Sequence, residues 1–106
     1  MGRSSVRLAA EAKSNLASIS DFIAANSPTN AVKWLERIEA KIETIAKLPL
    51  RHAIAYQTVD VGREVRLSFF GVYQILYVLD GEELVVIAIR HGARRPLSAS
   101  EVKKLT

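Results

Sequence analysis

Three arginines and a histidine fall within six residues near the C-terminal end of the chain. Arg90, His91, Arg94 and Arg95 directly follow an apolar run. Guanidinium groups suit carboxylate and phosphate partners, and a histidine exchanges its proton near neutral pH. Like charges this close repel one another, so contact with an acidic partner explains the cluster better than a solvated loop does. We therefore predict that these four residues bind a target.

A second kind of chemistry, RNA cleavage, is open to two of the basic residues. Cleavage needs groups that deprotonate the 2′-OH, stabilise charge on the phosphate and protonate the leaving oxygen. Arg66, on the polar face of a predicted strand, could clamp a phosphate, and His91 could act as acid or base. The structural alternatives are a cross-strand ion pair for Arg66 and a backbone hydrogen bond for His91. Both interpretations stay open here, and neither residue is firmly catalytic.

Metal and cofactor sites have no support in the sequence. His52 and His91 are the only histidines, there is no cysteine, and no carboxylate cluster has ligand spacing. Glycine-rich phosphate loops and nucleophile elbows are also absent. We expect no metal and no cofactor, and the lack of cysteine excludes disulfides and thiol catalysis.

Three strand-like runs position the basic residues. Residues 65–69 alternate apolar with polar, whereas residues 72–79 and 84–89 are apolar at nearly every position. The connections are short, Asp80-Gly81 among them, and short loops join antiparallel neighbours. The pattern predicts a three-stranded meander. Because the second and third strands lack a polar face, the face away from the helices needs cover from the C-terminal tail or from another chain.

Two amphipathic helices precede these strands. The first is predicted over residues 10–26, with an apolar stripe of Ala12, Leu16, Ile19 and Ile23 that Phe22 widens. Ser27 suits an N-cap and Pro28 the first helical position, so a second helix is predicted over residues 28–47. The short link makes the two an antiparallel hairpin. Residues 6–8 could add an edge strand and residues 55–58 another, and a capping-box spacing at Ser98 predicts a short final helix.

The fold class is therefore α+β: a helical hairpin packed on a mainly antiparallel sheet of three to four strands, in the order β-α-α-β-β-β. We expect one domain over residues 1–106, with a core at about 6–95 and a tail at 96–106. Apolar residues make up 49% of the chain and charged residues 25%, and the net charge is +4. That balance favours an acidic protein or nucleic acid as partner. No membrane-length apolar run or secretory signal is present, so a cytoplasmic location is expected.

Three local features resemble one family. They are the helix junction of residues 21–35, the segment from Gly62-Arg63-Glu64 to Tyr77, and the strand that closes in Arg90-His91-Gly92-Ala93-Arg94. Their order over about residues 6–95 is similar to the RelE/ParE superfamily of toxins from bacterial toxin–antitoxin operons. The His-Gly-Ala-Arg ending is similar to its ParE branch.

The resemblance implies two alternative activities. ParE-like members are associated with inhibition of DNA gyrase, whereas RelE-like members cut mRNA on the ribosome. Where many relatives carry arginine after Tyr73, this chain has Gln74, which cannot offset phosphate charge, and no lysine cluster lies between residues 51 and 66. The resemblance therefore favours a ParE-like toxin that inhibits by binding rather than as an enzyme. A ribosome-dependent endoribonuclease is the alternative.

The same resemblance implies the partners. An acidic antitoxin is expected to neutralise the toxin by covering its apolar surface, at Trp34, Val72, Gln74 and Leu76. DNA gyrase is the expected target, and no membrane contact or stable direct DNA binding by the toxin alone is expected. The arm over residues 90–105 has few apolar anchors, so we predict that it settles on the target.

Overall fold

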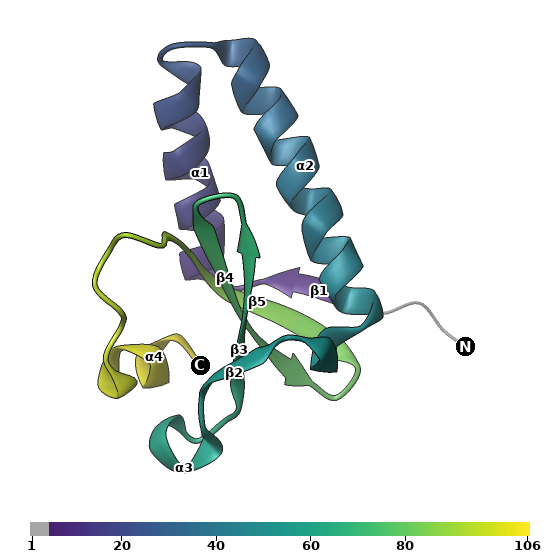
Figure 1. Ribbon diagram of the computed structural model, residues 1–106, viewed down its shortest axis with the longest axis vertical. Coiled ribbons are helices and arrows are strands. Elements are labelled where there is room, and N and C mark those ends of the chain that lie inside the picture. The colour runs from purple at the N-terminus through teal and green to yellow at the C-terminus, as the bar shows by residue number, and fades with distance from the viewer. Residues whose placement is uncertain (1–4) are drawn as a thin grey trace.

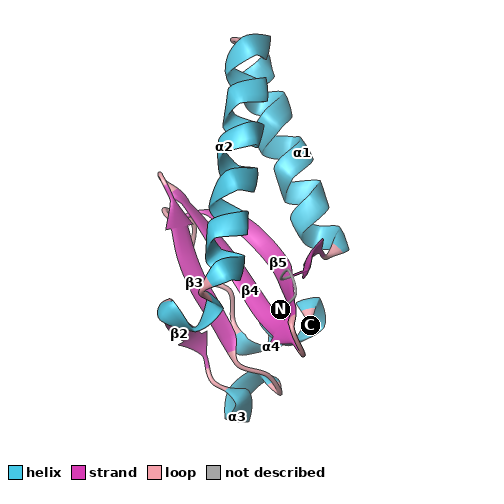
Figure 2. Ribbon diagram, turned by 90° about the vertical axis from the view of Figure 1, so that its right-hand side faces the viewer, coloured by secondary structure: helices cyan, strands magenta, loops and turns pink. Residues whose placement is uncertain are grey.

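A computed structural model describes residues 5–106, and in it a helical hairpin stands against one face of a twisted five-stranded sheet (Figures 1 and 2). The α+β class and the arrangement of the hairpin and the meander are confirmed. Within the described residues, none of the helices combines the length and the apolar character needed to span a membrane.

The hairpin consists of α1 (Ala10–Ala24) and α2 (Pro28–Lys47). Ser27 is the N-cap of α2, since its Oγ accepts a hydrogen bond from the Asn30 amide at 3.2 Å. The end of α1 comes two residues earlier than expected. The expectation that Phe22 widens the buried stripe is wrong: this side chain is 74% exposed. The hairpin extends past the sheet (Figure 1), so the last turn of α1 has no strand beneath it.

The sheet has strand order β1-β5-β4-β3-β2. Its members are β1 (Ser5–Leu8), β2 (Ala53–Tyr56), β3 (Val65–Phe70), β4 (Tyr73–Asp80) and β5 (Glu83–His91). The meander of β3, β4 and β5 is antiparallel, and β1 joins the edge of β5 in parallel. The sheet thus has one strand more than the upper expected number. Strand β2 also begins two residues before the expected start, because a short edge strand carries no clear apolar period.

Side chains from β4 and β5 form two separate cores, one on each face of the sheet. Tyr77 and Val86 pack against the hairpin, together with Ile38 and Ile45 of α2. On the opposite face another group is buried: Val61, Val65, Leu76, Val78, Val85, Ile87, Ala88 and Val102. The absence of a polar face in these strands is therefore explained by cover on both sides.

The chain's own C-terminal tail covers the second face. Helix α4 (Ala99–Leu105) buries Val102 completely in that core. It lies beside the short helix α3 (Thr58–Val61). Along the chain, the 3-10 turn η1 (Pro49–Arg51) and β2 come before α3. The capping box is confirmed, with Ser98 and Glu101 bonded reciprocally. The expectation that the tail stays free to settle on a target is wrong, because one fully buried valine and the flanking leucines suffice to seat it.

Candidate functional site

The basic residues at the end of β5 lie on a short, fixed loop. The Gly92 amide donates to the Val72 carbonyl at 2.7 Å, and the Arg94 amide donates to the His91 carbonyl at 3.1 Å. A Cβ at Gly92 would lie 3.2 Å from the Val72 carbonyl oxygen, so glycine allows this close approach. This turn fixes the backbone that carries the four basic residues, whose binding to a target stays a prediction.

Arg95 is held by the tail. Its guanidinium forms two hydrogen bonds with the Glu101 carboxylate, at 2.8 and 3.0 Å. The hydrogen bond from Arg95, with help from the Ser98 amide, lowers the pKa of Glu101 to about 2. The same hydrogen bond raises the pKa of Arg95. This arginine therefore anchors α4 to the loop.

Arg90 supports the loop from below. It projects from the tail face of the sheet opposite Gln74, and its Nη2 donates to the Arg95 carbonyl at 2.7 Å. Partial burial, followed by the nearby charges of Arg94 and Arg95, lowers its pKa. Arg90 therefore uses one of its N–H donors to hold the backbone of the loop.

Arg94 differs from its two neighbours because it is exposed and, within residues 5–106, forms no ion pair. It lines a hollow of about 390 Å³ beside α1, which it shares with Phe22, Tyr73 and His91. It also lines a hollow of about 520 Å³ on the tail face, next to Gln74. It lines a third hollow of about 340 Å³ as well, together with Glu11 and Glu101, so Arg94 is an exposed cation at the rim of three hollows.

His91 is exposed on the helix-facing side of the same strand end. Its Nδ1 accepts a hydrogen bond from the Ala93 amide at 3.0 Å, and its ring meets Tyr73 edge-on at a centroid distance of 5.7 Å. The backbone hydrogen bond considered from the sequence is present. It fixes the ring orientation while leaving Nε2 without a hydrogen-bond partner in the described chain.

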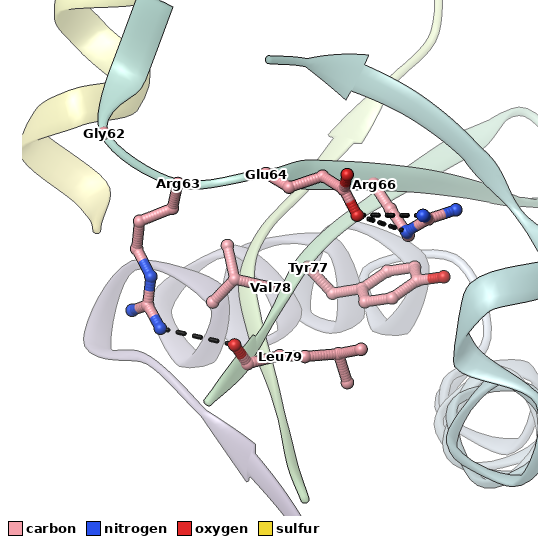
Figure 3. Close-up of a pocket in the computed structure, with 7 residues that line it drawn as sticks. All are labelled: Gly62, Arg63, Glu64, Arg66, Tyr77, Val78 and Leu79. Carbon is pink, nitrogen blue, oxygen red and sulfur yellow. Dashed lines mark hydrogen bonds and ion pairs between the residues drawn. The ribbon is translucent and has the colours of Figure 1, made fainter. Parts of the chain in front are cut away.

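Arg66, the second candidate catalytic residue, is engaged by its surroundings (Figure 3). Its Nε and Nη2 contact the Glu64 carboxylate at 3.0 and 2.8 Å, and Nη1 donates to the carbonyls of Leu50 and His52 at 3.1 and 2.5 Å. The arginine side chain is only 14% exposed. The ion pair is made with a neighbour on the same stretch of chain rather than across strands.

The structure does not bring Arg66 and His91 to one point. Arg66 pairs with Tyr77 and His91 with Tyr73, on opposite sides of β4. Four residues along a strand span about 13 Å, and two strand spacings add roughly 10 Å across. To share a phosphate with His91, Arg66 would have to leave the loop carbonyls that it now holds.

The four residues expected to contact an antitoxin do not form one patch. Trp34 is half-buried on the helix side, where it packs edge-on against Tyr73 at 5.4 Å. Val72 is 58% exposed at the turn between β3 and β4, whereas Gln74 lines the hollow on the tail face. Leu76 is 4% exposed and belongs to the core beneath the tail. A partner reaches Leu76 only if that tail moves.

Sequence reasoning missed two residues that shape the site. Tyr56 donates from its hydroxyl to the Leu97 carbonyl at 2.6 Å, which ties β2 to the start of the tail. Asn15 of α1 accepts a hydrogen bond from the Ile89 amide at 2.9 Å. Neither has a sequence signal, because each meets a partner more than forty residues away. In the described chain no group of histidine, cysteine or carboxylate side chains is placed to hold a metal ion.

The hairpin on a five-stranded mixed sheet has a counterpart among solved structures. One solved structure, titled "Chromosomal ParDE TA system from P. aeruginosa", superposes with a TM-score of 0.68 at 15% identity and covers 84% of this chain and 96% of that one. At this identity the likeness concerns the fold. No curated protein matches the chain.

The family is established by sequence. The family model described as the ParE toxin of type II toxin-antitoxin system, parDE, matches residues 6–96. The chain belongs to this family of toxins, and the predicted resemblance is confirmed. A type II system pairs its toxin with an antitoxin, so a cognate antitoxin is the implied partner.

Proposed function

We propose that this toxin inhibits DNA gyrase by binding it through Arg90, His91, Arg94 and Arg95, without catalytic turnover, and that it acts in the cytoplasm until a cognate antitoxin neutralises it. The observation that carries the proposal is the contrast among the basic residues. Arg94 is exposed and unpaired within the described chain, on a loop held in place by Arg90 and Arg95. A cation presented on a fixed backbone loses little entropy when it pairs with a partner's carboxylate.

The engagement of Arg66 weighs against the nuclease alternative. A phosphate clamp must be available when substrate arrives, yet this guanidinium already satisfies Glu64 and two loop carbonyls. Gln74 stands opposite Arg90 and adds no charge on the other face. The arrangement supports binding rather than RNA cleavage.

Neutralisation is proposed to occur by cover of the exposed apolar surface near the hairpin. Phe22 and Val72 are 74% and 58% exposed, Phe22 lines a hollow with Tyr73, and the half-buried Trp34 packs against Tyr73 and Phe70. An acidic antitoxin segment that becomes ordered as an amphipathic helix would suit such a surface. Adding the antitoxin should slow hydrogen exchange in residues 69–74, and unchanged exchange there would refute this part.

The direct test compares purified toxin in gyrase supercoiling with mRNA cleavage in a translation reaction. We expect blocked supercoiling and intact mRNA. Arg94→Ala should weaken inhibition by at least about tenfold, the loss typical of one charge-assisted contact, and more strongly at low salt than at high. Lys103→Ala, an exposed cation on the outside of α4, is the matched control and should inhibit like the parent. Cleaved mRNA with normal supercoiling would replace this proposal with the nuclease alternative.

A further inference from the structure

A second set of cations lies at the C-terminal end of α2, on the other side of the molecule from the loop that follows β5 (Figure 1). They surround a hollow of about 330 Å³. It is lined by Lys41, Thr44, Lys47, Leu48, Arg51 and His52. None of these residues is acidic, so nothing in the lining offsets the positive charge.

A row of cations on α2 leads to this hollow. Lys33, Arg37 and Lys41 are spaced four residues apart, which places them on one flank of the helix with about 6 Å between successive positions. The acidic residues of the helix, Glu36, Glu39 and Glu43, fall on the opposite flank of the buried stripe. Over residues 33–41 the cations and the carboxylates are therefore separated into two rows, whereas Lys47 follows Glu43 by four residues.

None of these cations forms an ion pair with another of the described residues. The four ion pairs found within residues 5–106 include none of Lys33, Arg37, Lys41, Lys47 and Arg51. Like charges four residues apart disfavour a helix. Partial burial, followed by the charges of Lys41, Arg51 and Arg66, lowers the pKa of His52. The row and the hollow together are named the α2 track.

The backbone at the end of the track is fixed from beneath. Arg66 donates to the carbonyls of Leu50 and His52, and the Tyr77 hydroxyl donates to the Pro49 carbonyl. Arg51 and His52 therefore project from a turn that is anchored to the sheet. A preformed surface binds an anion without first ordering its own backbone.

We infer that the α2 track binds the phosphate backbone of nucleic acid. From Lys33 to Lys47 the track spans about 21 Å of helix. Duplex DNA carries a charge about every 3.4 Å along each strand, so phosphates can meet the evenly spaced Lys33, Arg37 and Lys41 in any register. An acidic protein surface has no such repeat. Lysines act as point charges here, and contacts to phosphate alone carry no sequence information, so binding is independent of sequence.

Five cations allow up to about five phosphate contacts, which predicts a slope of roughly −4 to −5 in log K against log salt concentration. Such non-specific binding has a Kd of about 10⁻⁴–10⁻⁶ M at physiological salt. This affinity agrees with the expectation that the toxin alone forms no stable DNA complex. If the proposed gyrase binding holds, the track would meet the DNA that gyrase carries at a raised local concentration.

The test measures binding of the full-length toxin to a fluorescent 20-base-pair duplex of arbitrary sequence by anisotropy, over a range of salt concentrations. A triple variant, Arg37→Gln with Lys41→Gln and Arg51→Gln, should lower the slope by about 3 and weaken binding at low salt by at least about fivefold. The control triple variant removes equal charge elsewhere: Lys13→Gln, Lys103→Gln and Lys104→Gln. Thermal unfolding of both variants checks that they are folded.

Binding by the control triple should change by less than about twofold, since its charges lie off the track. Equal losses in both triples, or an unchanged slope in the first, would overturn the inference. A polyglutamate peptide should compete poorly with the duplex, and equal competition per charge would assign the track to an acidic protein instead. Gyrase takes no part in this experiment, so its outcome is independent of the proposed function.

Discussion

Two clusters of the same three residue types lie along the helix-facing side of β4, one at its first residue, Tyr73, and the other four residues along, at Tyr77. They are the locked cluster of Arg66, Tyr77 and His52, and the open cluster of Arg94, Tyr73 and His91. Their ring pairs are almost alike, with centroids 6.2 and 5.7 Å apart and interplanar angles of 84° and 78°. In the locked cluster the guanidinium and the phenol hydroxyl are bonded to the turn after α2. In the open cluster, Arg94 has no ion pair within the described residues.

The difference between the two clusters shows that the type of a residue does not by itself decide whether it stabilises the fold or stays free for a partner. The turn at η1 brings backbone carbonyls over the locked cluster, where they accept from Arg66 and Tyr77. At the open cluster the chain leaves β5 into an exposed loop. The same chemistry is therefore structural in one cluster and free for a partner in the other.

The largest effect on stability is expected from Arg66→Ala. The change leaves Glu64 and two backbone carbonyls without their donor, which should lower the free energy of unfolding by about 2–3 kcal/mol. Urea-induced unfolding measures it. Arg94→Ala is the matched variant of the open cluster and should stay within about 0.5 kcal/mol. Equal destabilisation by both would end the distinction between a locked and an open cluster.

A smaller effect is expected from removing a hydroxyl. Tyr77→Phe loses the hydrogen bond to the Pro49 carbonyl and should lower the free energy of unfolding by about 1 kcal/mol, whereas Tyr73→Phe should change it by less than half as much. A larger loss of unfolding free energy in Tyr73→Phe than in Tyr77→Phe would show that the open cluster is the one that stabilises the fold.

The hydroxyl of Tyr77 should lose its proton at a higher pH than an ordinary tyrosine does. Burial raises the pKa of Tyr77 to about 12, from 10.0 in the unfolded chain. Its contribution to stability is therefore complete below pH 10 and is lost as the pH rises from 10 toward 12. Ultraviolet titration of the parent and of Tyr77→Phe should show that the late phase is missing from the variant. A late phase that persists would assign it to another tyrosine.

The third effect concerns the tail that holds the loop of the open cluster. The pKa of Glu101 is about 2, against 4.5 for the free side chain. Its contribution is therefore present above pH 4.5 and is lost as the pH falls from 4.5 toward 2. The methyl signals of Val102 should shift over that window as α4 loosens. Glu101→Gln is the control and should show no such dependence, and an unchanged parent spectrum would contradict the anchoring role.

The smallest effect is expected from His91→Gln. Glutamine can still accept from the Ala93 amide, so the free energy of unfolding should change by less than about 0.5 kcal/mol. Toxicity in cells should stay within about threefold of the parent. A nuclease that used His91 for proton transfer would lose roughly 10²–10⁴ in rate. A folded, non-toxic variant would break the reading of the open cluster as a binding surface.

The sequence alone determined the elements that are strongly periodic and the signals that act within a few residues. The second helix, its Ser27 cap, the antiparallel meander and the capping box at Ser98 all follow from local spacing, and the structure contains each of them. The family followed from the same local features. Local propensity and pattern suffice where residues three or four apart, or on adjoining strands, make the stabilising contacts.

Only the tertiary structure decided which basic residues are free. Arg66 meets carbonyls 14 and 16 residues away, and Tyr56 meets a carbonyl 41 residues away. The tail covers the second apolar face, although its own sequence has few apolar anchors, because α3 and the sheet supply the rest of that core. Such contacts depend on how the chain closes on itself. No spacing along the sequence encodes them, so the sequence does not show that Arg66 is held by the turn after α2 or that Arg94 is exposed.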